Sequence, residues 1–164
     1  MDINSENKLK EICPIIANRV RKAASALSEQ SITIRVIQGL RSWDMQQELW
    51  QQGRDINGKI IDPKKIVTDA PPGHSWHQYG LCVDVAPFNL EGQPIWDIKD
   101  PAWKAITAIA PQFKLLSGAC FSDLVDMPHW QAIEIPESPT DEDRLIFREV
   151  GMIGVWKEYG LEED

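Results

Sequence analysis

The sequence lacks any apolar run of the roughly 18 residues that a membrane-spanning helix needs, so an integral membrane protein is excluded. It has only three cysteines, Cys13, Cys82 and Cys120, which is an odd number in no tight spacing. That pattern argues against a disulfide scaffold and against a zinc knuckle built from cysteines. The first ten residues are polar and charged, and no apolar stretch follows them. We therefore expect no secretory signal peptide and a chain made in the cytoplasm.

Positive charge is also scarce. The chain has 17 Lys and Arg residues against 25 Asp and Glu residues, which gives a net charge of −8. From Glu137 onward there are nine acidic and three basic residues, so most of the excess lies in the C-terminal segment and the rest is nearly neutral. A body without a basic stripe offers no surface to a phosphate backbone, and nucleic-acid binding is not expected.

The remaining composition is that of an ordinary globular protein, with 43% hydrophobic and 26% charged residues. A chain of 164 residues corresponds to about one domain and can bury a substantial core. No internal repeat and no long linker divides the chain. We therefore treat residues 1–164 as a single domain, in which residues 136–164 form an acidic C-terminal extension.

Hydrophobic periodicity predicts helices and strands mixed along the chain. The expected helices cover residues 4–13, 14–29, 42–53 and 101–110, and the expected strands cover residues 31–37, 81–86 and 129–135. Thr140 and Asp143 form a capping-box pattern, which predicts one further, solvated helix in the extension. Because the elements do not alternate regularly as in βαβ units, the sequence predicts an α+β fold.

All three histidines lie in two short segments, residues 73–84 and 126–131. In the predicted strand 81–86, Asp84 shares a face with small residues, which leaves room for an ion beside its carboxylate. His77 lies just upstream of this strand, and His129 comes from a separate strand. Two histidines and one carboxylate are the usual ligands of a catalytic zinc ion, so we predict a metal site at His77, Asp84 and His129.

Asp126 stands three residues before His129, with Pro128 between them, so the segment differs from a helical HExxH motif. An extended or turned segment can still place this carboxylate beside a metal-bound water, where Asp126 would act as the general base. Two alternatives remain open at this point. His74 could pair with His77 on a metal, and Asp126 could be a simple cap or surface acid.

The pattern Ser75-x-His77-x-x-Gly80-x-x-x-Asp84, followed by Asp126-x-x-His129-Trp130, resembles the zinc D-alanyl-D-alanine carboxypeptidase family. The similarity is greatest to its L-alanyl-D-glutamate endopeptidases, which include phage endolysins and their bacterial relatives. The stretch from Gly39 to Arg54 and the segment Val67-Thr68-x-Ala70 look like that branch as well. The resemblance extends from about residue 9 to residue 131.

This resemblance implies one zinc ion on His77, Asp84 and His129, with Asp126 at the position of the catalytic acid. Arg41 matches an arginine that stabilises the developing oxyanion in relatives. Ser75 and Gln46 match positions that line the substrate site. The family fold is a small antiparallel sheet flanked by helices and is shared with the hedgehog signalling domain.

The implied substrate is the stem peptide of bacterial peptidoglycan, and the expected reaction is cleavage between L-Ala and D-Glu. A D,D- or L,D-carboxypeptidase that removes terminal D-Ala is the alternative within this class, because the ligands are shared. A non-catalytic zinc-binding module with the hedgehog fold is the alternative from another class, and Asp126 favours the enzyme. We expect a monomer that acts on the cell wall after release from the cytoplasm, as in phage lysis.

The sequence departs from the family pattern at two places. Cys82 stands where the family often has alanine, and we interpret this small, commonly buried residue as packing. Residues 117–119 read Ser-Gly-Ala where relatives frequently carry Trp-Gly-Gly, which affects the expected shape of the substrate groove but not the metal ligands.

Overall fold

The computed structural model describes residues 1–122 and 125–162. Their longer helices are α1 (Ile3–Leu9), α2 (Pro14–Glu29), α3 (Trp43–Gln51), α4 (Pro101–Ile109), α5 (Asp141–Val150) and α6 (Met152–Glu158). The strands are β1 (Thr33–Gln38), β2 (Cys82–Phe88), β3 (Leu115–Ser117) and β4 (His129–Ala132). Short 3₁₀ helices are η1 (Pro63–Lys65), η2 (Trp76–Tyr79), η3 (Ala110–Phe113) and η4 (Gly118–Cys120).

The four strands form one antiparallel sheet in the order β1-β2-β4-β3. In this register Asp84 lies opposite His129, and Cys82 lies opposite Gln131. Side chains alternate along a strand, so these four residues share one side of the sheet, which we call the site face. An antiparallel sheet flanked by helices is the α+β fold that the sequence predicts.

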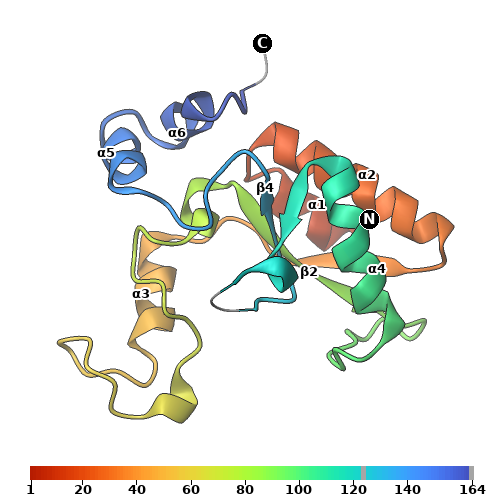
Figure 1. Cartoon of the computed structure of the whole chain (residues 1–164), viewed down its shortest axis with the longest axis horizontal. Coiled ribbons are helices and arrows are strands. Elements are labelled where there is room, and N and C mark those ends of the chain that lie inside the picture. The colour runs from red at the N-terminus through yellow and green to blue at the C-terminus, as the bar shows by residue number, and fades with distance from the viewer. Residues whose placement is uncertain (123–124, 163–164) are drawn as a thin grey trace.

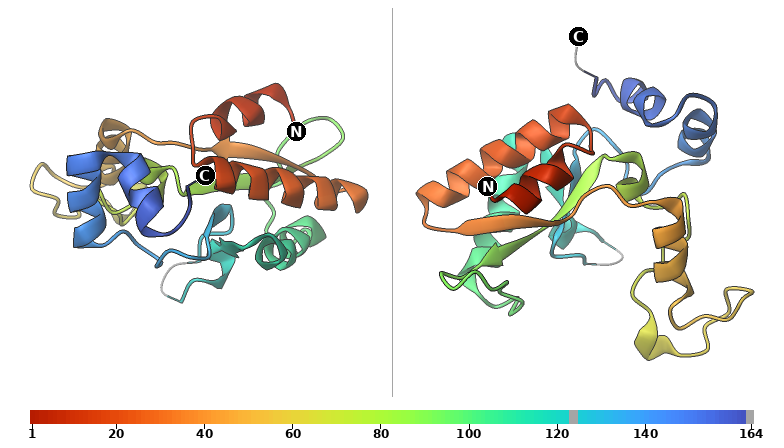
Figure 2. Two further views of the ribbon diagram at one scale, coloured as in Figure 1. Left: turned by 90° about the horizontal axis from the view of Figure 1, so that it is seen from above. Right: turned by 180° about the vertical axis from the view of Figure 1, so that it is seen from behind.

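The other face of the sheet packs into the hydrophobic core. Val83, Val85 and Trp130 are fully buried there, and α2 and α4 contact both the sheet and each other. Helix α1 covers the outer edge of β1, where the hydroxyl of Ser5 accepts a hydrogen bond from the backbone N–H of Val36 at 3.0 Å. Figures 1 and 2 show α1, α2 and α4 at one end of the molecule and α3, α5 and α6 at the other.

The C-terminal extension differs from the single solvated helix that the sequence predicts. It forms two helices, which are separated at Gly151, whose φ of 84° is a conformation that suits glycine. Val155 and Leu161 are buried, and the indole N–H of Trp156 donates to the carbonyl of Tyr79 at 2.7 Å.

The predicted capping box of Thr140 and Asp143 is present and starts α5, most of which is exposed. The prediction is wrong in giving a single solvated helix, because α6 follows and the chain beyond α5 is partly buried against η2.

Two strands also differ from the sequence-based expectation. The strand predicted over 129–135 ends at Ala132, because the chain turns there and the N–H of Ile135 bonds back to the carbonyl of Ala132. Strand β3 was not predicted, since three residues are too few to show a strand period. Among the described residues, no helix is long and apolar enough to cross a membrane.

Burial of the extension predicts that truncating Leu161 to alanine destabilises the whole domain. Leu161 is 1% exposed, whereas Leu145 in the same extension is 52% exposed. We expect Leu161→Ala to lower the free energy of unfolding by about 2–5 kcal/mol, and the control Leu145→Ala to change it by no more than about 0.5 kcal/mol. Urea unfolding measures both, and equal losses would contradict the packing described here.

Candidate metal centre

The three predicted ligands meet on the site face. The Nε2 atom of His77 lies 3.2 Å from Oδ1 of Asp84, and Nδ1 of His129 lies 3.5 Å from the same oxygen. The planes of the two imidazole rings meet at 78°, and their centroids lie 5.4 Å apart. Both histidines are buried. One carboxylate oxygen therefore stands between two imidazole nitrogens that come from η2 and β4.

The backbone determines which nitrogen of His77 is available. Its Nδ1 atom lies 2.8 Å from the carbonyl oxygen of Gly39. A carbonyl oxygen only accepts hydrogen bonds, so Nδ1 carries a proton and donates it. The atom left to a metal is Nε2, which is the one that faces Asp84.

The chemistry of these donors and the separations of the two nitrogens from Asp84 suit a zinc ion. Zinc ligands at about 2.0–2.2 Å in a tetrahedron stand roughly 3.3 Å from one another, and the two nitrogen-to-oxygen separations at Asp84 are 3.2 and 3.5 Å. Among the described residues, the sets whose three ligand atoms all lie within 4.8 Å of one another are His77 with Cys82 and His129, and Asp84 with Asp126 and His129. The predicted set shares two residues with each of them. Burial, followed by the negative charge of Asp84, raises the pKa of the Cys82 thiol. Without a metal the thiol is therefore protonated, whereas Asp84 is a carboxylate, which favours Asp84 as the third ligand.

Charges in the centre are strongly coupled. Burial by itself would raise the pKa of Asp84, but the charges of His77 and His129 and their hydrogen bonds outweigh it and hold that pKa well below its usual range. Burial by itself would lower the pKa of His129, but the hydrogen bond and charge of Asp84 raise it. Without a metal, the coupling therefore favours the charged carboxylate of Asp84 beside the protonated form of His129.

Asp126 lies at the mouth of the centre. Its carbonyl accepts the N–H of His129 at 3.1 Å, so the segment is a turn rather than a helix, as predicted. A Cβ at Gly118 would stand 2.5 Å from this carbonyl, so only glycine permits the close approach. Desolvation and then the negative charge of Asp84 raise the pKa of Asp126. A carboxylate with a raised pKa is suited to accept a proton.

Arg41 reaches the centre from the loop after β1. Its Nη2 lies 3.7 Å from Oδ2 of Asp84, and its Nη1 donates to Oε1 of Gln46 at 2.9 Å. The side-chain amide of Gln46 donates in turn to the carbonyl of Ala70 at 2.7 Å. Gln46 was predicted to bind substrate, but it is fully buried, and its contact is with Arg41. Nε of Arg41 is buried and has no hydrogen-bond partner among the described residues.

The centre opens into a cavity of about 590 Å³. Ser75, the third site residue predicted from the first motif, lies on its wall but makes no side-chain cap contact with η2. Phe121, Glu137 and Ser138 also line the cavity and were not predicted as site residues. Nothing in their spacing marks them, since Phe121 comes from the segment after η4 and Glu137 and Ser138 come from the extension.

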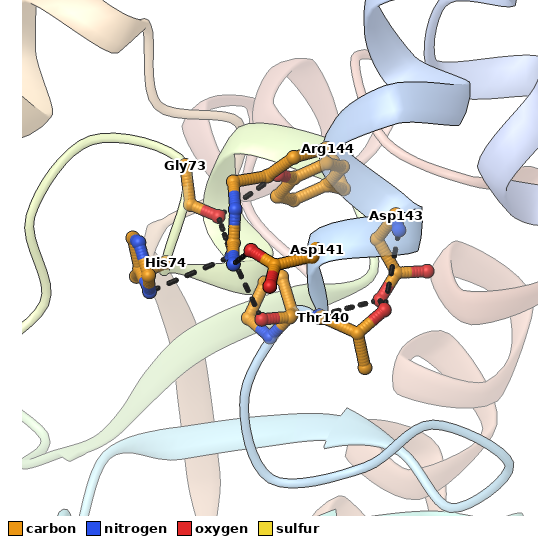
Figure 3. A network of polar contacts seen from close by, with 8 residues as sticks. Gly73, His74, Thr140, Asp141, Asp143 and Arg144 are labelled. Atoms are coloured by element: carbon orange, nitrogen blue, oxygen red, sulfur yellow. Dashed lines mark hydrogen bonds and ion pairs between the residues drawn. The ribbon is translucent and has the colours of Figure 1, made fainter.

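His74 lies on the same cavity wall and is held by the extension (Figure 3). Nη1 of Arg144 lies 3.5 Å from Nδ1 of His74 and donates to the carbonyls of Pro139 at 3.0 Å and Gly73 at 3.4 Å. Partial burial and the charge of Arg144 lower the pKa of His74. A guanidinium at this nitrogen disfavours a metal ion there, so the geometry supports the pair His77 and His129 over the pair His74 and His77.

Comparison with known proteins agrees with this arrangement. Residues 9–116 match the family model VanY, described as D-alanyl-D-alanine carboxypeptidase. The match includes Arg41, His77 and Asp84 and ends before Asp126 and His129. Peptidoglycan L-alanyl-D-glutamate endopeptidase CwlK from Bacillus subtilis (strain 168) is 29% identical over 143 residues, covering 79% of this chain and 82% of CwlK.

Two solved structures share the fold. The L-Ala D-Glu endopeptidase ChiX of Serratia marcescens has a TM-score of 0.55 at 22% identity and covers 92% of both chains. A variant of the vancomycin-resistance D,D-pentapeptidase VanY, in complex with Zn(II), has a TM-score of 0.54 at 15% identity, covering 88% of this chain and 80% of that one. At these identities the likeness establishes the fold.

The coupling between Asp84 and His129 predicts a pH dependence for the metal-free protein. A pKa of His129 above its ordinary 6.5 means that its protonation contributes stability below pH 6.5 and that this is lost as pH rises through the folded value. The depressed pKa of Asp84 contributes stability that is lost only in strong acid. We expect Asp84→Asn to lower the pKa of His129 and to abolish the loss of stability above pH 6.5.

NMR titration of the His129 ring in chelated protein measures this shift. Asp97→Asn, which changes an exposed acid outside the cavity, is the control and should leave the titration unchanged. An unaltered His129 titration in Asp84→Asn would contradict the coupling.

Proposed function

Because this chain belongs to the D-alanyl-D-alanine carboxypeptidase family, we propose that it is a zinc-dependent peptidase that cleaves the stem peptide of bacterial peptidoglycan between L-Ala and D-Glu. The observation that carries the proposal is the convergence of His77, Asp84 and His129 beside Asp126 on an open cavity. The names of CwlK and ChiX support the choice of bond, and the Zn(II) complex of VanY supports the metal.

The charge of the cavity also supports an endopeptidase. Among the described residues that line it, Arg41 is the one Lys or Arg, and it is already held by Gln46 and Asp84. The acidic residues on the wall are Asp69, Asp84, Asp126 and Glu137. A carboxypeptidase must bind the terminal carboxylate of its substrate beside the scissile bond, and this wall offers no second cation for it. The carboxypeptidase remains the second candidate because of the family name.

Each residue has a separate part in the reaction. Zinc held by His77, Asp84 and His129 would supply Lewis-acid chemistry, which polarises a carbonyl and makes water more acidic. Asp126 accepts the proton of the attacking water and passes it to the leaving amine, for which its raised pKa is suited. Arg41 stands beside the centre, where its guanidinium stabilises the negative charge that develops on the carbonyl oxygen.

Digestion of purified peptidoglycan tests the proposed bond. We expect mass spectrometry to find fragments with a new N-terminal Glu, and to find none after the zinc has been removed with a chelator. Loss of D-Ala alone would reassign the protein to the carboxypeptidases. An unchanged wall with zinc bound would contradict the enzyme and favour a zinc-binding module without turnover.

The role of Asp126 is tested by Asp126→Asn. We expect kcat to fall by about 10²–10⁴-fold, because the amide cannot accept the proton of the attacking water. Zinc content should not change if Asp126 is the base and Asp84 is the ligand. Loss of zinc from Asp126→Asn would instead support the set Asp84, Asp126 and His129 and would contradict the assignment of the base.

A further inference from the structure

We propose that Gln131 is a positioning residue that holds His129 with Nδ1 directed to the metal. The inference rests on the metal site of the proposed function but not on which bond is cleaved. Gln131 follows His129 by two residues on β4, so both side chains lie on the site face. Gln131 is fully buried, and none of the motifs in the sequence includes it.

A backbone carbonyl determines how the Gln131 amide is turned. Its Nε2 lies 2.9 Å from the carbonyl oxygen of Pro136. That oxygen can only accept, so the amide NH₂ must face Pro136, and the reversed amide would oppose two acceptors. The other end, Oε1, therefore faces His129 and lies 3.1 Å from its Nε2.

The tautomer of His129 follows from this orientation. Because Oε1 of Gln131 can only accept, Nε2 of His129 carries a proton and donates it. The nitrogen left to a metal is Nδ1, which lies 3.5 Å from Oδ1 of Asp84. A metal-ligating histidine is ordinarily oriented by such a partner on its other nitrogen. Gln131 thus does for His129 what the carbonyl of Gly39 does for His77.

The same carbonyl also anchors the other half of the site. The indole N–H of Trp76 donates to Pro136 at 2.8 Å, and Trp76 immediately precedes His77 in η2. Pro136 is the first residue of the C-terminal extension. Its carbonyl therefore links the extension to both η2 and β4, the elements that carry His77 and His129. A buried glutamine that only filled space would need neither the hydrogen bond that Gln131 accepts from His129 nor the one that it donates to Pro136.

Zinc affinity of the full chain, measured by competition with a chelator, tests the proposal. Gln131→Leu keeps the approximate volume and removes the acceptor, and we expect it to weaken zinc binding by about 10–100-fold. Gln131→Glu keeps an acceptor for His129 but sets its second oxygen against the Pro136 carbonyl, so we expect an affinity between those of Gln131→Leu and the wild type. Ser5→Ala, which removes a buried hydrogen bond at the far edge of β1, should lower stability and leave zinc affinity unchanged.

NMR of the ¹⁵N-labelled, zinc-loaded wild type gives a measurement that does not depend on a variant folding. We expect His129 to show zinc on Nδ1 and a proton on Nε2. Zinc on Nε2, or a Gln131→Leu affinity equal to that of the wild type, would overturn the proposal even if the protein digests peptidoglycan. If the Gln131 effect is present but the wall stays intact, the proposed function fails and the positioning role stands.

Discussion

The carboxylate of Asp84, held between the imidazoles of His77 and His129, is the interaction on which the rest of the site depends. It exists because β2 and β4 pair with Asp84 opposite His129. The intervening residues Val83 and Val85 are fully buried on the other face. A slip of one residue would turn Asp84 into the apolar core and the valines onto the site face. The hydrophobic core therefore fixes the register that makes the metal centre.

The C-terminal extension supports this centre from outside the part of the chain that matches the family model. Pro136 accepts the donors of Trp76 and Gln131, Trp156 donates to the carbonyl of Tyr79, and Arg144 contacts His74. These contacts bracket η2, the short 3₁₀ helix that carries His77. Four residues of 3₁₀ helix have little stability alone. The acidic extension is thus part of the scaffold of the site rather than a tail.

The predicted metal ligands are easier to recognise in the sequence than the residues that hold them in place. Pro14 and Ser42 mark helix starts, and the alternation of β2 marks Asp84 as facing away from the core, so these features were predictable from local pattern alone. Gln131 follows His129 with the period of a strand and could have been found by the same reasoning. Glu137 reaches the cavity only through tertiary packing, and β3 exists only because β4 pairs with it. Local periodicity carries no information about such contacts.

Both histidines that we propose as ligands owe their tautomer to the backbone rather than to charge. His77 donates to the carbonyl of Gly39 directly, and His129 donates to Gln131, whose amide is turned by the carbonyl of Pro136. Backbone carbonyls do not titrate, so the nitrogen that each histidine offers stays the same at every pH at which the protein is folded. What pH changes is whether that nitrogen carries a proton, which competes with the metal. The fold thus determines which nitrogens face the metal, and the proton that His129 takes up beside Asp84 competes with the metal for one of them.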